Sequence, residues 1–244
     1  MADQARIALV TGAARRVGRE IALALARAGF DIAVHYGSSE QEARDVVAQI
    51  EDSGRRAQAF QANLDETSSA VELARAVTDS FGPVDVLVLS ASSYPMGEVG
   101  SLAPEDLLAP LRVNLVTPFL LAQEIGLGMR MRGHGQIITL LDWSLDRPDP
   151  RYIPYQISKA GLREATFGLA RALAPEVRVN GIAPGAVLLP EGTTDERQEA
   201  VRRKTLVGHL GSPGDVARAV LYLIDAEHFV TGTVLRVDGG RSLL

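Results

Sequence analysis

Short apolar runs alternate with amphipathic stretches along almost the whole chain. Runs with little polar alternation, such as VDVLVLS, are typical of parallel strands that are covered on both faces. The pattern predicts seven strands, at residues 6–10, 31–36, 56–60, 84–90, 135–141, 177–182 and 233–237.

The stretches between these strands carry apolar side chains at helical spacing. Val17, Ile21 and Leu25 fall on one stripe, which ends at Gly29. The same spacing predicts further helices at about 40–52, 66–80, 105–131, 153–173 and 213–225. This alternation implies right-handed strand–helix–strand units. We therefore expect a single α/β domain over 1–244, with a doubly wound, seven-stranded parallel sheet and helices on both of its faces.

One segment departs from the tight alternation. Residues 186–212 are longer, polar and charged, and lie between the sixth and seventh predicted strands. Insertions of this kind usually cover an active site. We expect this segment to cover the substrate.

Composition and charge narrow the class of protein. The 244 residues are 46% hydrophobic and 23% charged, as in globular proteins with a sizeable core, and the net charge of -5 argues against nucleic acid or an anionic membrane as a partner. No apolar run approaches the roughly 20 residues that span a bilayer, and the N-terminus shows no charged-then-apolar leader, so we expect a cytoplasmic protein. Cysteine is absent, which excludes disulfides and thiolate metal sites. His35, His134, His209 and His228 lack ligand spacing, and we expect no metal site.

The connection between the first strand and the first helix reads TGAARRVG. Thr11, Gly12 and Gly18 fit a glycine-rich turn at which backbone N–H groups and the helix dipole meet a pyrophosphate. Arg16 stands where a central glycine is usual, and with Arg15 it could bind phosphate bidentately. The alternative is an ordinary strand–helix turn.

The end of the second strand, HYGSSE, distinguishes NAD from NADP. An NAD enzyme has an Asp or Glu there, which would repel a 2′-phosphate, whereas the first acid in this chain is Glu40. The 2′-phosphate could bind to the hydroxyls of Ser38 and Ser39, the imidazole of His35 and the guanidinium of Arg15. We therefore expect NADPH. His35 could instead be a strand-end histidine with its hydrogen bonds satisfied inside the protein.

Tyr155 and Lys159 are four residues apart on the predicted helix 153–173. On one helix face, an ammonium close to a phenol lowers the pKa of the tyrosine. Tyr155 could then donate a proton while a nicotinamide delivers hydride. The alternative is a partly exposed structural pair.

Five motifs occur in a fixed order along the chain: TGAARRVG, VNLVTPF, YQISK, RVNGIAPG and TGTVLRVDGG. With them the sequence resembles the short-chain dehydrogenases/reductases over essentially all of its length. The resemblance implies a Rossmann fold, a homotetramer and a water-linked proton relay from Asn114 to Lys159. It also implies that Lys159 holds the nicotinamide ribose.

The departures from that family's usual motifs resemble the pteridine reductases. The segment after the fourth strand is LSASSY, Asn63 stands for the usual Asp, and Asp142 stands for the usual catalytic Ser. This resemblance implies that Arg16 touches both the pyrophosphate and a pterin, that Ser92 lines the site, and that Tyr94 stacks over the pterin. Where eukaryotic members have an arginine at the 2′-phosphate, this chain has Ser38.

The sequence thus predicts three sets of site residues. The catalytic residues are Asn114, Asp142, Tyr155 and Lys159. The substrate-binding residues are Arg16, Ser92, Tyr94, Asp142 and Tyr155. The cofactor-binding residues are Thr11, Gly12, Arg15, Arg16, Val17, Gly18, His35, Tyr36, Ser38, Ser39, Asn63, Leu64, Ser90, Ala91, Ser92, Tyr155, Lys159, Pro184, Gly185 and Val187.

Asp142 favours a substrate that carries N–H donors. A reduced pterin presents such donors to a carboxylate, whereas beside a plain ketone the carboxylate would oppose the developing negative charge. Asp142 could instead only cap the following loop. Two other functions stay open: a carbonyl or 3-oxoacyl reductase in which Ser144 replaces the missing serine, and a non-catalytic NADP-binding sensor. Trp143 could be a pocket wall, although packing is the favoured interpretation.

Overall fold

The computed structural model describes residues 5–189, 192–226 and 229–244. Its strands form one seven-stranded sheet in the order β3-β2-β1-β4-β5-β6-β7, and every neighbouring pair is parallel. The strands are β1 (Ile7–Val10), β2 (Asp31–Tyr36), β3 (Ala57–Gln61), β4 (Val86–Leu89), β5 (Gly135–Leu140), β6 (Val177–Pro184) and β7 (Val234–Val237). The predicted α/β fold with a doubly wound parallel sheet is confirmed.

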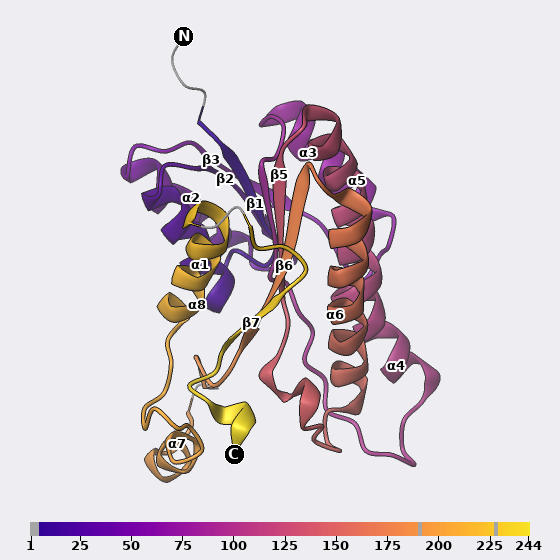
Figure 1. The fold of residues 1–244 in the computed structure, drawn as a ribbon, viewed down its shortest axis with the longest axis vertical. Coiled ribbons are helices and arrows are strands. Elements are labelled where there is room, and N and C mark those ends of the chain that lie inside the picture. The colour runs from indigo at the N-terminus through magenta and orange to yellow at the C-terminus, as the bar shows by residue number, and fades with distance from the viewer. Residues whose placement is uncertain (1–4, 190–191, 227–228) are drawn as a thin grey trace.

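Helices cover both faces of the sheet (Figure 1). One face carries α1 (Arg16–Arg27), α2 (Glu40–Asp52) and α8 (Pro213–Leu221). The other carries α3 (Ser69–Ser80), α5 (Thr117–Arg132) and α6 (Ile153–Leu173), with α4 (Pro104–Leu111) packed on α6. The strands β1, β2 and β4 are buried along their whole length, which explains their continuous apolar runs, whereas the edge strands β3 and β7 stay partly exposed.

The chain reverses its direction of travel across the sheet between β1 and β4. From β1 it builds outward to β2 and β3, and it then returns to β4 on the other side of β1. In doubly wound sheets, ligands bind in the crevice outside the carboxyl ends of the strands at this reversal. The topology alone therefore locates the candidate site.

The stretch predicted as a helix over 105–131 is helical throughout in the structure, although its hydrogen-bond pattern changes along its length. The structure divides it into α4, a π-helical turn η1 (Arg112–Val116) and α5. Pro118 explains part of this change, because it has no N–H to donate to the carbonyl of Asn114 four residues earlier. The predicted helix 213–225 likewise changes after α8 into a π-helical turn, η3 (Tyr222–Ala226).

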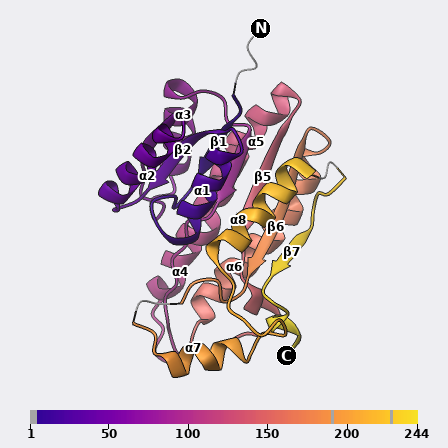
Figure 2. The same cartoon turned by 90° about the vertical axis from the view of Figure 1, so that its left-hand side faces the viewer.

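Segment 186–212 contains a helix that the sequence pattern did not reveal. This helix, α7 (Asp195–Arg202), buries none of its residues, so it lacks the apolar stripe by which the other helices were recognised. Thr194 caps its start by accepting a hydrogen bond from the Arg197 N–H. Figure 2 shows α7 beyond the carboxyl ends of the strands, at the same end of the molecule as the C-terminus.

Two short 3-10 helices complete this end of the molecule. They are η2 (Trp143–Asp146), which follows β5, and η4 (Arg241–Leu243), which follows β7. The two pack against each other. None of the described helices has the length and apolar character that crossing a membrane requires.

Candidate active site

A cleft of about 1370 Å³ opens at the carboxyl ends of the strands. Its walls come from the turn after β1, from the connections after β4, β5 and β6, and from the C-terminal turn. The predicted site residues that line it are Gly12, Arg15, Arg16, Val17, Gly18, His35, Asn63, Leu64, Ser90, Ala91, Ser92, Tyr94, Asp142, Tyr155, Pro184, Gly185 and Val187. Those absent from its lining are Thr11, Tyr36, Ser38, Ser39, Asn114 and Lys159.

The turn after β1 depends on two glycines. Gly12 has φ +65°, and a Cβ there would lie 2.9 Å from the Ala91 Cα. A Cβ on Gly18 would lie 2.2 Å from the Gly12 carbonyl oxygen. No larger residue fits at either position without moving backbone, so the turn is a close backbone cradle of the kind that receives a pyrophosphate.

Arg16 occupies a conformation that favours glycine. Its φ is +54°, in the left-handed region, at the position where a glycine is usual in glycine-rich turns of this kind. Its guanidinium donates to the carbonyl of Leu188 over 3.3 Å, which connects the turn to the segment after β6. The neighbouring Arg15 is exposed and forms an ion pair with Glu42 of α2.

Thr11 stabilises the turn after β1. The side chain is buried, and its Oγ1 accepts hydrogen bonds from the N–H groups of Ser90 and Ala91, over 2.9 and 3.1 Å. These bonds fasten the turn after β1 to the end of β4. Thr11 thus shapes the cleft without lining it.

His35 uses both of its ring nitrogens inside the protein. Nδ1 accepts from the Gly12 N–H over 3.0 Å, and Nε2 lies 3.1 Å from the Ala62 carbonyl, to which it donates. Burial lowers the pKa of the imidazole from 6.5 to about 4, so the ring is neutral near pH 7. The expected phosphate contact is therefore corrected: His35 holds the turn and leaves Ser38 and Ser39, at the surface, as the candidate 2′-phosphate ligands.

Asp142 connects η2 to Tyr155. Its Oδ1 accepts from the Ser144 N–H over 2.7 Å and caps η2, and its Oδ2 accepts from the Tyr155 hydroxyl over 2.9 Å. The carboxylate therefore caps the loop and also contacts the predicted proton donor. The Ser144 hydroxyl accepts from the side chain of Gln156 over 3.2 Å.

The environment of Tyr155 raises its pKa well above 10. Burial is the largest cause, followed by the negative charge of Asp142 and the hydrogen bond that the phenol donates to it. The expectation that Lys159 lowers this pKa is wrong in this structure. The phenol is protonated at neutral pH, the form that can donate a proton.

Lys159 is fully buried, and its Nζ donates to the carbonyl of Leu140 over 2.6 Å. Burial lowers the pKa of its ammonium to about 8, and the charge of Asp142 opposes this effect. The group therefore stays mostly charged at neutral pH. It lies behind the cleft wall, on the same helix as Tyr155.

Asn114 is buried in η1, and its side-chain amide is fully engaged. Nδ2 donates to the Ser93 carbonyl and to the Ser158 hydroxyl, over 2.8 and 2.9 Å, and Oδ1 accepts from the Ser93 N–H over 2.8 Å. Asn114 therefore fixes the segment after β4 against α6. Its main-chain carbonyl lacks the α-helical donor because of Pro118.

Aromatic side chains gather around Tyr155. The ring of Tyr94 stacks on Tyr152 with centroids 4.6 Å apart and meets Tyr155 edge-on at 4.4 Å. Tyr94 remains 58% exposed and lines the cleft. Tyr152 was not among the predicted site residues, although it lies three residues before Tyr155.

Two further residues belong to the cleft lining. Trp143 lines the cleft, so the interpretation as packing alone is wrong, and the guanidinium of Arg241 lies 4.4 Å from its ring centroid. Arg241 follows the C-terminal VDGG motif, and nothing in its spacing signalled a role. Among the described residues no group of His, Cys, Asp or Glu could hold a metal ion, and His228 lies outside those residues.

A protein-family comparison now adds to this geometry. Residues 12–242 match the family model described as enoyl-(acyl carrier protein) reductase. The chain belongs to this family of short-chain dehydrogenases/reductases, and it is an oxidoreductase.

Relatives within the family differ in their substrates. The chain is 30% identical to an L-rhamnose 1-dehydrogenase (NAD(P)(+)) of Sphingomonas sp. (strain SKA58), over 97% of this chain and 96% of the relative. It is 31% identical to the 3-oxoacyl-[acyl-carrier-protein] reductase FabG of Staphylococcus epidermidis, over 96% and 97%. Among solved structures, FolM alternative dihydrofolate reductase 1 from Brucella canis, complexed with NADP, is 33% identical with a TM-score of 0.92, over 98% of this chain and 94% of that one.

Proposed function

We propose that the protein is an NADPH-dependent reductase that transfers hydride to a pterin-type substrate: a dihydropteridine, dihydromonapterin or dihydrofolate. Tyr155 is the proton donor. The observation that carries the proposal is the 2.9 Å hydrogen bond from the Tyr155 hydroxyl to the Asp142 carboxylate, at the wall of a cleft with aromatic sides.

The residues present fit NADPH. The backbone at Gly12 and Gly18 forms the pyrophosphate cradle, and Arg15 and Arg16 supply positive charge beside it. The first acid after β2 is Glu40, which is paired with Arg44. The NADP in the FolM structure supports the same cofactor here. When bound, NADPH supplies the hydride.

Side chains of the protein then bind the substrate ring and transfer the proton. Asp142 is an acceptor for an N–H of the substrate ring, and Tyr155 holds the proton that passes to a ring nitrogen as the neighbouring carbon receives hydride. Because the pKa of Tyr155 is raised, the phenol stays protonated until the proton is transferred to the substrate. Each turnover adds one hydride and one proton across a C=N bond of the substrate.

Lys159 and Asn114 return the proton to Tyr155. We propose that the Asn114 carbonyl, which lacks its helical donor, and the Lys159 ammonium share a water in this relay. The side-chain amide of Asn114 holds Ser93 and Ser158 and has no free donor for this role.

The cleft walls suit a flat heteroaromatic ring. Tyr94 and Trp143 offer aromatic surfaces, and Arg16 and Ser92 offer polar contacts at the cofactor side. The likeness to FolM, whose name states a dihydrofolate reductase activity, supports a pterin substrate.

A 3-oxoacyl or carbonyl reductase is the second candidate, because relatives such as FabG act on that class by name. Against it, the position next to Tyr155 holds a carboxylate, and a carboxylate opposes the negative charge that develops on a carbonyl oxygen. A non-catalytic sensor would not need the buried Tyr155 and Lys159.

The test is NADPH oxidation with a panel of dihydropterins, dihydrofolate and simple ketones. We expect turnover with at least one dihydropterin or dihydrofolate, much weaker turnover with ketones, and kcat/KM about tenfold or more higher with NADPH than with NADH. Turnover of ketones alone would contradict the pterin proposal. Absence of turnover with every substrate, despite NADPH binding, would favour the sensor.

We also propose that the protein is a cytoplasmic homotetramer with a single domain over 1–244. Apolar side chains on α5 and α6 that stay exposed in one chain support the assembly, among them Phe119, Leu127 and Ile157.

A further inference from the structure

Arg241 has a buried polar atom without a partner. Its Nε is inaccessible to solvent and has no hydrogen-bond partner, and no ion pair of its guanidinium occurs within the described ranges 5–189, 192–226 and 229–244. Buried donors are nearly always satisfied in folded proteins, and each exception requires an explanation. The guanidinium nevertheless lines the cleft.

The protein fixes Arg241 in this position. Asp238 accepts from the N–H groups of Gly240 and Ser242, over 3.0 and 2.8 Å, which shapes the turn on both sides of Arg241. Gly239 and Gly240 have φ values of +61° and +77°, and side chains at either would collide with the segment after α7. Trp143 packs against the guanidinium plane. The arginine is therefore held rigidly at its place in the cleft wall.

Arg241 lies away from the part of the cleft that would bind the phosphates of the cofactor. Its neighbours Trp143, Asp142 and Tyr94 belong to the reacting end, where Asp142 and Tyr94 act on it electrostatically without a hydrogen bond. The glycine turn with Arg15 and Arg16 follows β1, whereas Trp143 follows β5 and Arg241 follows β7, and β4 lies between β1 and β5 in the sheet. A ligand of Arg241 is therefore part of the substrate.

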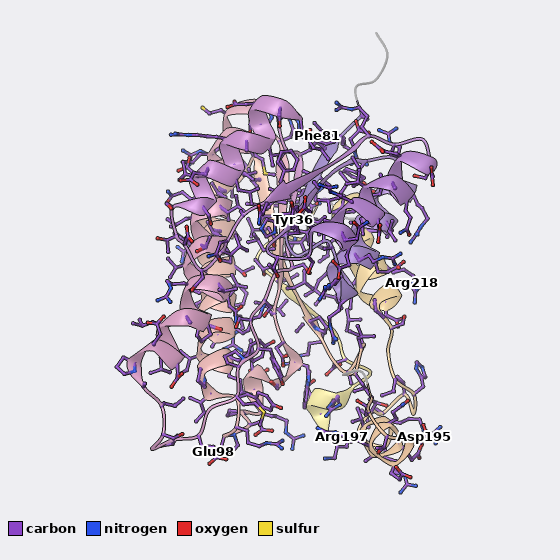
Figure 3. The ribbon with its side chains drawn as sticks, turned by 180° about the vertical axis from the view of Figure 1, so that it is seen from behind. Tyr36, Phe81, Glu98, Asp195, Arg197 and Arg218 are labelled. Carbon is purple, nitrogen blue, oxygen red and sulfur yellow. The ribbon has the colours of Figure 1, made fainter. Side chains whose placement is uncertain are left out.

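The rim on this side adds positive charge. Arg197 and Lys204 line the cleft from α7 and the residues after it, and neither side chain forms an ion pair with another described residue. Figure 3 shows Arg197 on α7, beside the C-terminal turn. Since the whole chain carries a net charge of -5, unpaired cations at this rim do not follow from composition.

We propose that Arg241, with Arg197 and Lys204 at the rim, binds an oxyanion on the side chain of the substrate. The proposal rests on the proposed function and narrows it, because the preferred substrate becomes a reduced pterin whose substituent carries a carboxylate or a phosphate. A guanidinium binds such groups through two parallel hydrogen bonds. Asp142, which accepts N–H donors from the ring, cannot bind an anion.

The kinetic test compares three substrates with NADPH: dihydrofolate, which carries carboxylates; dihydroneopterin monophosphate, which carries a phosphate; and 6-methyl-dihydropterin, which carries no charge. In Arg241→Gln, KM for the preferred anionic substrate should rise about 10-fold to 100-fold, as for a lost hydrogen bond to a charged group, with kcat nearly unchanged. KM for 6-methyl-dihydropterin should change less than about twofold, and Arg241→Lys should restore part of the loss. Arg27→Gln, which removes one surface charge outside the cleft, is the matched control.

A second readout does not depend on turnover. Trp143 is the only tryptophan, so its fluorescence reports on ligands beside Arg241. Titration of the NADP⁺-loaded protein with N-benzoylglutamate should give a saturable change that weakens about tenfold or more in Arg241→Gln and weakens at high salt. Equal effects of Arg241→Gln on charged and neutral substrates, or dicarboxylate binding that Arg241→Gln leaves intact, would overturn the inference. A wild-type protein that reduces no pterin would instead contradict the proposed function.

Discussion

Single residues set the chemistry at the wall of the cleft. The phenol of Tyr155 is buried and protonated, and its only described hydrogen bond goes to Asp142. Lys159 behind it keeps a positive charge that burial makes costly, since a pKa of about 8 in place of 10.5 corresponds to about 3 kcal/mol. Charged groups with strongly shifted pKa values cluster at functional sites, and the Lys159 ammonium lies on the proposed proton path.

Replacement of Tyr155 by Phe removes one hydroxyl and keeps the ring. We expect kcat to fall about 10²-fold to 10⁴-fold, the usual contribution of a general acid, while the dissociation constant of NADPH stays within about twofold. Steady-state kinetics and NADPH fluorescence titration measure the two quantities. Near-normal turnover with every active substrate would mean that another group donates the proton.

Arg16 combines backbone strain with function. Because its φ is +54°, Arg16→Gly relieves the strain that Arg16→Ala keeps, and both remove the guanidinium. We expect the Gly variant to be more stable than the Ala variant by about 1 kcal/mol in urea unfolding, while both lose kcat/KM about tenfold or more. Equal stability of the two variants would show that the left-handed conformation costs nothing here.

Motif spacing predicted many cleft residues. Gly12 and Asp142 follow directly after β1 and β5, Gly18 belongs to the glycine motif at the start of α1, and Tyr155 stands one helical turn from Lys159. Motif spacing could not predict Arg241, whose role depends on packing against Trp143 from a distant part of the chain. For the same reason it could not decide about His35, since one partner of that ring is on the turn after β1 and the other follows β3.

At the scale of elements, side-chain hydrogen bonds hold the loops that build the cleft. His35 at the end of β2 fixes the turn after β1, Thr11 fixes that turn to β4, and Asp146 of η2 pairs with both Arg163 and Arg236. The sheet thus presents rigid loop positions to the ligands. The pattern found the central strands because they are apolar on both faces, and missed α7 because none of the residues of that helix is buried.

The His35 clamp predicts a dependence of stability on pH. The folded state holds the imidazole neutral with a pKa of about 4, whereas the unfolded chain binds a proton near pH 6.5. Between these values the unfolded state binds more protons, so stability falls as pH falls from about 6.5 to 4, by up to about 3 kcal/mol. Asn at this position can accept and donate without titrating, so we expect His35→Asn to lose less stability over this range. The measurement is the free energy of unfolding of both proteins by urea at each pH. An equal fall for the two proteins between pH 6.5 and 4 would contradict this assignment.

At the scale of the whole molecule, one face of the chain stays apolar and exposed. Phe119, Leu127 and Met131 lie along α5, and Ile157 is near the start of α6, with exposed fractions of 37 to 85%. Because exposed apolar surface can mark an interface, we propose that these side chains take part in contacts between subunits.

We expect a homotetramer by light scattering coupled to size-exclusion chromatography. The double variant Phe119→Asp/Leu127→Asp should give a smaller species, because charges would be buried in the interface. Val99→Asp changes a more exposed apolar residue, in the loop after β4, and serves as the control. A wild-type protein that elutes as a monomer would contradict the proposed assembly.

The central claim is that the Asp142 carboxylate selects a substrate with N–H donors. Asp142→Asn keeps the size of the side chain and its cap on η2 but removes the charge, and Asp142→Ser introduces the hydroxyl of a carbonyl reductase. The deciding measurement is kcat/KM of the wild type and both variants on a dihydropterin and on a ketone. We predict that both variants lose about 10²-fold or more on the dihydropterin, while any ketone activity survives or rises in Asp142→Ser. Unchanged dihydropterin turnover in Asp142→Asn would contradict the claim and leave Asp142 as a loop cap only.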